Sequence, residues 1–176
     1  RTFKKAQKLH KHGAKVAKSL KHAVSGADII ITMLSDDNAV LSIINKKEFI
    51  ENINSNSILI DMSSTKPKTA IKINCLLKKK KIKFLDAPVS GGTKGAENAS
   101  LAIMVGGNKS LFNKVKKILN LMGSAIHVGP VGSGQISKLA NQIIVGVTIG
   151  AVAEAIHFCK KNGVDPNKFI KAIEGG

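Results

Sequence analysis

Apolar segments of two different periods alternate along most of the chain. Short runs rich in Ile, Leu and Val indicate strands, and segments with apolar residues every three or four positions indicate amphipathic helices. The first run is continuously apolar, which predicts a strand buried on both faces of a parallel sheet. The predicted strands are Ala27–Leu34, Ser57–Met62, Ile82–Ala87, Leu101–Val105 and Ala125–Val128.

Helical patterns lie before and between these strands. Ser19 and Asn108 can cap two of them, and Asp36 or Asp37 can open a third. Strands that alternate with helices of this length predict right-handed crossovers and a mostly parallel α/β sheet. The predicted helices are Phe3–Gly13, Ser19–Val24, Asp36–Ile50, Lys66–Lys80 and Asn108–Met122.

The pattern changes after the last predicted strand. A Gly-rich segment, Pro130–Gly134, leads into a long helix from Gln135 to about Asn162, whose middle is apolar nearly all round. Such a helix is expected to be surrounded by protein. The longest apolar stretch, Ile143–Ala153, is shorter than the roughly 18–20 residues of a membrane span, so the sequence predicts no membrane segment.

Composition adds a strong basic charge carried almost wholly by lysine. The 176 residues include 28 Lys and Arg against 11 Asp and Glu, a net charge of +17, while 43% of residues are hydrophobic, which excludes disorder. Arg1 is the one arginine, and the chain has no Trp or Tyr. Arginine forks and stacked aromatics are the usual means of nucleic-acid recognition, so only non-specific attraction to polyanions is expected. The run Lys78–Lys81 is expected to be a solvated helix end.

The number of cysteines bears on the cellular compartment of the protein. Cys75 and Cys159 are too few for a disulfide framework, and both are expected in the cores of helices. Their scarcity favours a reducing compartment, and with no targeting segment evident we expect a cytoplasmic protein. The five histidines show no metal-like spacing, so no metal site is predicted.

Candidate functional residues follow the carboxyl ends of three predicted strands. Ligands of parallel sheets collect at the carboxyl ends of the strands. Met33-Leu34-Ser35 and Ser63-Ser64-Thr65 follow two strands there, and each is also compatible with an ordinary connection. After a third strand, Ser90-Gly91-Gly92 can bring successive backbone N–H groups and one hydroxyl to an anion, although a simple turn is the alternative.

A second candidate site lies at the start of the long helix and includes Lys138. Lys138, Asn141 and Gln142 share one face at the start of the long helix. Burial there would lower the pKa of the amine and make it a usable general acid near neutral pH. The alternative is a lysine whose ammonium extends back to solvent.

These segments together resemble the β-hydroxyacid dehydrogenase family, which includes 3-hydroxyisobutyrate dehydrogenases and tartronate semialdehyde (2-hydroxy-3-oxopropionate) reductases. The first motif is Asp86-Ala87-Pro88-Val89-Ser90-Gly91-Gly92-Thr93-Lys94-Gly95-Ala96, and the second is Gly129-x-x-Gly132-x-Gly134-x-x-x-Lys138-x-x-Asn141. The segments 138–145 and 151–155 look closest to the tartronate semialdehyde reductases. Decarboxylating 6-phosphogluconate dehydrogenases share the fold but carry His where this chain has Ala140.

The resemblance implies a partial Rossmann domain with a doubly wound, mostly parallel sheet, followed by the start of an all-α domain. The expected division is residues 1–129, lacking the first strand and its Gly-rich turn, and residues 130–176, a truncated helical domain. It also implies an NAD(P)-dependent oxidoreductase that converts 2-hydroxy-3-oxopropionate to glycerate. The full-length protein would be a dimer or tetramer.

Roles are carried over residue by residue. The resemblance implies that Lys138 protonates the carbonyl oxygen of a small carboxylate substrate. It assigns the substrate carboxylate to Ser90, Gly91 and Gly92, and further substrate contacts to Asn141 and Gln142. Cofactor contacts would fall on Met33, Leu34 and Ser64. Arg1 and Thr2 match a family segment that meets the ribose 2′-phosphate, which favours NADP over NAD.

Departures from the family leave alternatives open. Ser35 and Ala99 stand where the family commonly has Pro and Gly. Because the Gly-rich turn that would hold the cofactor pyrophosphate is absent, the 176-residue chain is expected to bind NADPH poorly. The alternatives are a 3-hydroxyisobutyrate dehydrogenase and a non-catalytic remnant of the family with affinity for polyanions.

Overall fold

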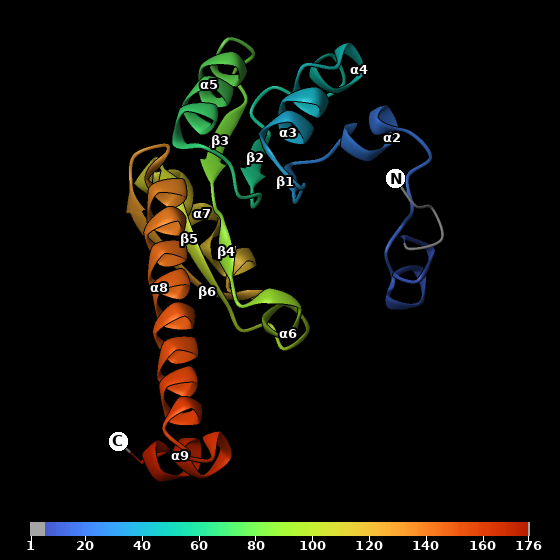
Figure 1. The fold of residues 1–176 in the computed structure, drawn as a ribbon. Helices are drawn as coiled ribbons and strands as arrows, with labels where there is room; N and C mark the ends of the chain where they lie inside the picture. The colour runs from blue at the N-terminus through green and yellow to red at the C-terminus, as the bar shows by residue number, and fades with distance from the viewer. Residues whose placement is uncertain (1–5, 176) are drawn as a thin grey trace. The chain divides into compact units, whose positions relative to one another are not determined.

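A six-stranded sheet organises the first part of the chain. The computed structural model describes residues 6–175. The strands follow the order β1-β2-β3-β5-β4, with β6 paired to β5 (Figure 1). β1, β2 and β3 are mutually parallel, β5 runs antiparallel to β3 and β4, and β6 is parallel to β5. The predicted mostly parallel α/β sheet is therefore confirmed. The strands are β1 Ile29–Thr32, β2 Ile58–Asp61, β3 Lys83–Asp86, β4 Val89–Ser90, β5 Leu101–Gly107 and β6 Gly123–Gly129.

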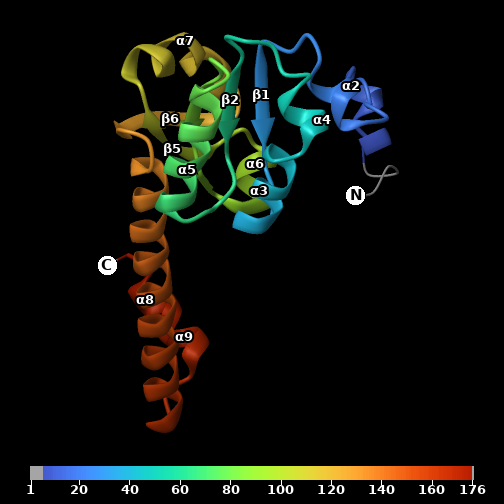
Figure 2. The ribbon, with the colours of Figure 1, turned by 90° about the horizontal axis from the view of Figure 1, so that it is seen from above.

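Helices cover both faces of the sheet because side chains alternate along each strand. Leu59 and Phe84 point into a core shared with α3 and α5, while their neighbours Ile60 and Leu85 point into a second core shared with α7. Figure 2 shows β1 and β2 side by side, with α3 and α4 following β1. The helices of this part are η1 His10–His12, α2 Leu20–Val24, α3 Asp37–Ile44, α4 Lys47–Ile50, α5 Pro67–Lys78, α6 Gly92–Glu97 and α7 Lys109–Leu119.

The predicted helix caps are present. Ser19 Oγ accepts from the His22 N–H, and Asp36 Oδ1 accepts from the Ala39 N–H at 2.8 Å. Asn108 Oδ1 caps α7 through the Leu111 N–H. Each cap satisfies a backbone donor that has no partner within its helix.

Several local details of the structure differ from the predictions. The helix predicted over Asp36–Ile50 divides into α3 and α4, because the chain turns at Asn45 and Lys46. β1 is not buried on both faces, since Ile31 is 42% exposed. Cys75 is exposed and Cys159 is partly exposed, so neither is a core residue. The short β4 and α6 carry too few residues to show a period and were not predicted.

The chain divides into two compact units, Arg1–Lys138 and Leu139–Gly176. The second contains most of α8 (Ser133–Lys161) and α9 (Pro166–Ile173). Gly163 ends the long helix with φ +74°, and Asp165 caps α9 by accepting from the Asn167 N–H. The predicted long helix is confirmed.

The apolar surface of α8 is exposed within this chain. Ile143 and Ile144 are 68% and 66% exposed, so the predicted covering by protein does not come from residues 6–175. Among the described helices, α8 alone is long and apolar enough to cross a membrane, and none of that stretch is buried. The prediction of no membrane segment considered only the stretch Ile143–Ala153 and not the helix as a whole. Length and composition alone are weak evidence, since helices in the cores of soluble proteins meet the same criterion.

Candidate active site

Three buried polar residues end neighbouring parallel strands. Thr32 is the register partner of Asp61, and Asp61 is the register partner of Asp86. All three are buried, and Thr32 Oγ1 donates to Asp61 Oδ1 at 2.9 Å. The carboxyl edge of the sheet is therefore built on a row of buried polar groups.

Asp61 is the less well satisfied of the two carboxylates. Its Oδ1 also accepts from the Ser63 N–H at 3.2 Å, while Oδ2 has no hydrogen-bond partner. Burial raises the pKa of Asp61, opposed by the hydrogen bonds from Ser63 and Thr32, and the nearby Asp86 raises it further. The geometry favours a proton on this carboxyl more than at an exposed aspartate.

Asp86 holds the Gly-rich segment that precedes α8. Its Oδ1 accepts from the Gly132 N–H at 2.8 Å, and its Oδ2 accepts from the Gln135 N–H at 3.1 Å. Burial raises the pKa of Asp86 too, against the lowering effect of the Gly132, Gln135 and Gly134 amides. The Asp86 carboxylate thus accepts hydrogen bonds from backbone N–H groups at the start of α8, which have no partner within the helix.

Gln135 joins the same turn to the loop after β2. Its Oε1 accepts from the Thr65 N–H at 2.9 Å, and its Nε2 donates to the Ser63 carbonyl at 2.8 Å. The side chain is 1% exposed. Because both ends of the amide are used, Gln135 fixes the spacing between this loop and the start of α8.

Close backbone approach requires glycine in this turn. A Cβ on Gly134 would lie 2.8 Å from the Asp86 carbonyl oxygen and closer still to the Met104 carbonyl oxygen. Both contacts are with backbone, which cannot move away easily. The Gly132-x-Gly134 spacing noted in the sequence therefore serves to seat α8 against β3 and β5.

Lys138 lies one helical turn after Gln135, at the end of the first unit. The side chain is partly buried, and burial lowers the pKa of Lys138 below its ordinary value. The direction is the one predicted from the sequence. Because Asp86 and Gln135 fix the first turn of α8, the position of the Lys138 Cα is set by the carboxyl edge of the sheet.

Ser90, Gly91 and Gly92 form the sharp turn from β4 into α6. Gly91 has φ +129° and Gly92 has φ +60°, a left-handed conformation that favours glycine. A Cβ on Gly92 would meet nothing within 4 Å, so its side of the turn is open. The three residues are partly or fully exposed, and a small anion can reach the backbone there.

The predicted cofactor contacts lie at the carboxyl ends of β1 and β2. Met33 is 63% exposed, Ser64 is exposed, and the Leu34 N–H donates to Ser63 Oγ at 2.9 Å. That hydrogen bond joins the two strand-end loops, so the structure brings Leu34 and the Ser63–Thr65 segment together. Arg1 and Thr2 lie outside the described residues.

Asn141 and Gln142 follow Lys138 in α8 but belong to the second unit. Asn141 Nδ2 and Gln142 Oε1 are 3.4 Å apart. Within residues 6–175 no group of three His, Cys, Asp or Glu side chains is placed to hold a metal ion.

The sequence interpretation missed the residues that build the edge. Thr32, Asp61 and Gln135 were assigned no role, and Asp86 was quoted only as part of a motif. One signal was available, because Thr or Asp recurs near the ends of three predicted apolar strands. A polar residue at the end of a buried strand has to find a hydrogen-bond partner.

Comparison with known families agrees with this arrangement. Residues 1–132 match the model of the NAD binding domain of 6-phosphogluconate dehydrogenase, and residues 132–176 match that of the NAD-binding domain of NADP-dependent 3-hydroxyisobutyrate dehydrogenase. The chain belongs to the β-hydroxyacid dehydrogenase family. The two matches of this family meet at residue 132, in the turn that Asp86 holds.

Individual members of the β-hydroxyacid dehydrogenase family resemble nearly the whole chain. An uncharacterized oxidoreductase of Bacillus subtilis is 41% identical, over 100% of this chain and 62% of its own length. The mitochondrial 3-hydroxyisobutyrate dehydrogenase of Drosophila melanogaster is 35% identical, over 92% of this chain and 50% of its own length. The chain therefore spans about half to two-thirds of the length of these relatives.

A solved structure shows the same fold. The 3-hydroxyisobutyrate dehydrogenase of Mycobacterium tuberculosis, solved with L-serine, superimposes with a TM-score of 0.88 at 33% identity, covering 97% of this chain and 58% of that one. The predicted partial Rossmann sheet followed by a helical segment is confirmed. α8 lies within the match over residues 132–176.

Proposed function

We propose that this chain forms the cofactor-binding half and supplies the catalytic lysine of an NAD(P)-dependent dehydrogenase of small β-hydroxyacids. The observation that carries the proposal is the setting of Lys138. Its amine is partly buried, and burial lowers its pKa. It lies one turn beyond the start of α8, which Asp86 and Gln135 hold in place. Family membership supplies the class of chemistry, in which bound NAD(P) takes or gives a hydride.

Lys138 acts on the oxygen of the reacting carbon. In the oxidation of a β-hydroxyacid, the amine accepts the hydroxyl proton as the C–H bond breaks and the carbonyl forms. In the reduction of a semialdehyde, the ammonium returns that proton to the developing alkoxide. A cation at this oxygen stabilises the transition state more than the ground state, and a lowered pKa brings the amine closer to the working pH.

The carboxylate of the substrate is assigned to Ser90, Gly91 and Gly92. The open side of Gly92 and the exposed turn support this assignment, since backbone N–H groups without side chains suit an anion. Asn141 and Gln142 are proposed to hold the remaining polar groups of the substrate.

The residues at the carboxyl edge fit a dinucleotide. Exposed Met33 offers an apolar surface, and Ser64 offers a hydroxyl from the neighbouring strand-end loop. This edge is where nucleotide-binding sheets hold their ligands. We assign Met33, Leu34 and Ser64 to the cofactor, with Arg1 and Thr2 as candidates for recognising the 2′-phosphate of NADP.

Two substrates have separate support. The names of the Drosophila and Mycobacterium relatives favour the 3-hydroxyisobutyrate and methylmalonate semialdehyde pair. The segments 138–145 and 151–155 favour 2-hydroxy-3-oxopropionate, which is reduced to glycerate. The exposed apolar surface of α8 supports assembly into a homo-oligomer.

The test measures NADH and NADPH turnover with both semialdehydes. Two proteins are compared: the 176-residue chain, and a chimera in which it replaces the matching segment of the Bacillus subtilis relative. In the chimera, Lys138→Met is expected to lower kcat by roughly 10²–10⁴, the usual contribution of a general acid.

Lys160→Met is the matched control, because Lys160 is an exposed lysine of the same helix. We expect its kcat to remain within about twofold of the parent chimera. A loss below about tenfold in Lys138→Met would remove the lysine from the proposed mechanism.

A further inference from the structure

Strand β3 has an open edge at its amino end. Lys83 and Phe84 pair with β2 on one side, whereas β5 pairs only with Leu85 and Asp86 on the other. The start of α7 lies across from this unpaired stretch, where Asn108 Oδ1 accepts from the Leu111 N–H at 3.0 Å. The open edge is at the opposite end of β3 from Asp86 and the candidate active site.

Two cavities adjoin this edge and share lining residues. One of about 440 Å³ lies among α5, the start of β3 and α7, and another of about 230 Å³ extends along α7. Lys83, Asn108 and Leu111 line both. The larger volume falls within the roughly 300–1,000 Å³ of small-molecule sites.

The charge of these cavities is of one sign. Lys78, Lys81 and Lys83 line the larger cavity, and Lys83 and Lys114 line the smaller. No Asp or Glu lines either cavity, and within residues 6–175 no ion pair neutralises these lysines. By contrast, a third cavity beside β6 contains one lysine, Lys116. The accumulated positive charge favours an anionic ligand.

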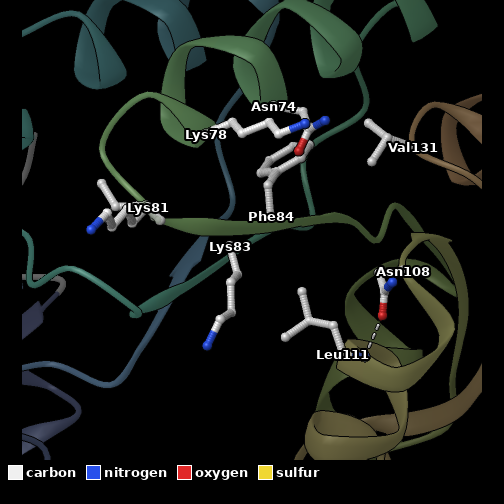
Figure 3. Close-up of a pocket in the computed structure, with 9 residues that line it drawn as sticks. Asn74, Lys78, Lys81, Lys83, Phe84, Asn108, Leu111 and Val131 are labelled. Atoms are coloured by element: carbon white, nitrogen blue, oxygen red, sulfur yellow. Dashed lines mark hydrogen bonds between the residues drawn. The ribbon is translucent and has the colours of Figure 1, made fainter.

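The lysines are spread along the edge of the strand. Figure 3 shows Lys78 beside Asn74 on the Phe84 side of β3, while Lys83 extends from the other side of the strand. Phe84 is 3% exposed, so it forms the floor of the cavity and offers no ring for a base to stack on. Lysines on both sides of the strand suit a ligand with several linked anionic groups better than a single small anion.

We propose that the open edge of β3 is a binding site for a ligand with several linked phosphate groups, distinct from the cofactor site. Lys83 and Lys114 hold one phosphate, and Lys78 holds another on the Phe84 side of the strand. Asn74 donates an additional hydrogen bond. Lysine point charges suit phosphate, and the absence of an exposed aromatic side chain in the cavity disfavours single-stranded nucleic acid.

The experiment titrates the whole 176-residue chain with inorganic tripolyphosphate in an isothermal calorimeter, at about 0.15 M salt to screen diffuse attraction. We expect saturable binding at one site per chain, at least about tenfold tighter than that of orthophosphate. The double variant Lys83→Gln with Lys114→Gln is expected to weaken binding by at least about tenfold, as is the single variant Lys78→Gln.

The matched control is Lys168→Gln with Lys171→Gln, which removes the same charge from exposed positions of α9. Its affinity for tripolyphosphate should remain within about twofold of the parent. Amide chemical shifts are expected to change at Asn74 and Ser110 in the parent chain and not in the Lys83 and Lys114 variant. The proposal is overturned by equal weakening in both double variants, by no saturable binding, or by equal affinity for an oligodeoxythymidylate with the same number of phosphates.

Discussion

Asp61 and Asp86 stand side by side as register partners at the ends of β2 and β3, and both are completely buried. Their surroundings differ. Both oxygens of Asp86 accept from backbone N–H groups at the start of α8, whereas Asp61 Oδ2 has no partner. The two carboxylates therefore contribute differently to the same edge of the sheet.

Substitution by asparagine distinguishes the two. Asp61→Asn keeps an oxygen for Thr32 and Ser63 and removes a buried charge, so we expect the free energy of unfolding to stay unchanged or to rise. Asp86→Asn turns an amide donor toward the donors of Gly134 and Gln135, and is expected to lower the free energy of unfolding by about 1–3 kcal/mol. Urea unfolding of both variants measures the difference. Equal destabilisation of the two would contradict the assignment.

The same carboxyls predict a pH dependence. Because burial raises the pKa of both groups, the folded chain binds their protons more tightly than the unfolded chain. Their unfavourable contribution is therefore largest near neutral pH, and it disappears as the pH falls through the raised pKa values toward 3.8. Any stability advantage of Asp61→Asn should be largest near neutral pH and shrink toward about pH 4, measured by urea unfolding at several pH values.

Gln135 is expected to stabilise the junction between the β2 loop and α8. Gln135→Leu has a similar volume but leaves the Thr65 N–H and the Ser63 carbonyl without partners. Each unsatisfied buried group costs about 1–3 kcal/mol, so a clear fall in the urea midpoint is expected. The control Gln7→Leu changes an exposed glutamine and should alter the free energy of unfolding by no more than about 0.5 kcal/mol.

Two glycines of α8 should respond oppositely to alanine. Gly134→Ala places a methyl group against the Asp86 and Met104 carbonyls and is expected to cost about 1–3 kcal/mol in the free energy of unfolding. Gly146→Ala meets nothing within 4 Å and should raise helix stability by about 0.5–1 kcal/mol. Thermal unfolding followed by circular dichroism compares them, and a stabilising Gly134→Ala would show that the turn is not closely packed.

The amine of Lys138 can be followed without an assay of activity. Because burial lowers its pKa, we expect one Cε resonance of a ¹³C-lysine-labelled chain to titrate at lower pH than the ordinary lysine value of 10.5. The resonance should be missing from the spectrum of Lys138→Met and present in that of Lys160→Met. Titration of the assigned Lys138 signal at or above 10.5 would contradict the burial argument.

The elements that were predicted well are those with a strong local signal. Ser19, Asp36 and Asn108 marked helix starts correctly, because a cap is made by residues only three positions apart. The main strands were found because each is a compact apolar run. The break between α3 and α4 was missed, since the apolar spacing continues through Asn45 and Lys46.

The alternation of strands and helices, the Gly-x-Gly turn and the segment that carries Lys138 can all be predicted from local sequence, because they depend on residues close together in the chain. Two long-range hydrogen bonds cannot be predicted in this way: Asp86 accepts from Gly132, 46 residues away, and Gln135 bridges to Thr65, 70 residues away. Hydrogen bonds between distant residues depend on how strands pair and helices pack. No local period in the sequence encodes that arrangement. The buried polar residues at the carboxyl edge of the sheet, which support the candidate active site, were therefore identified only in the three-dimensional structure.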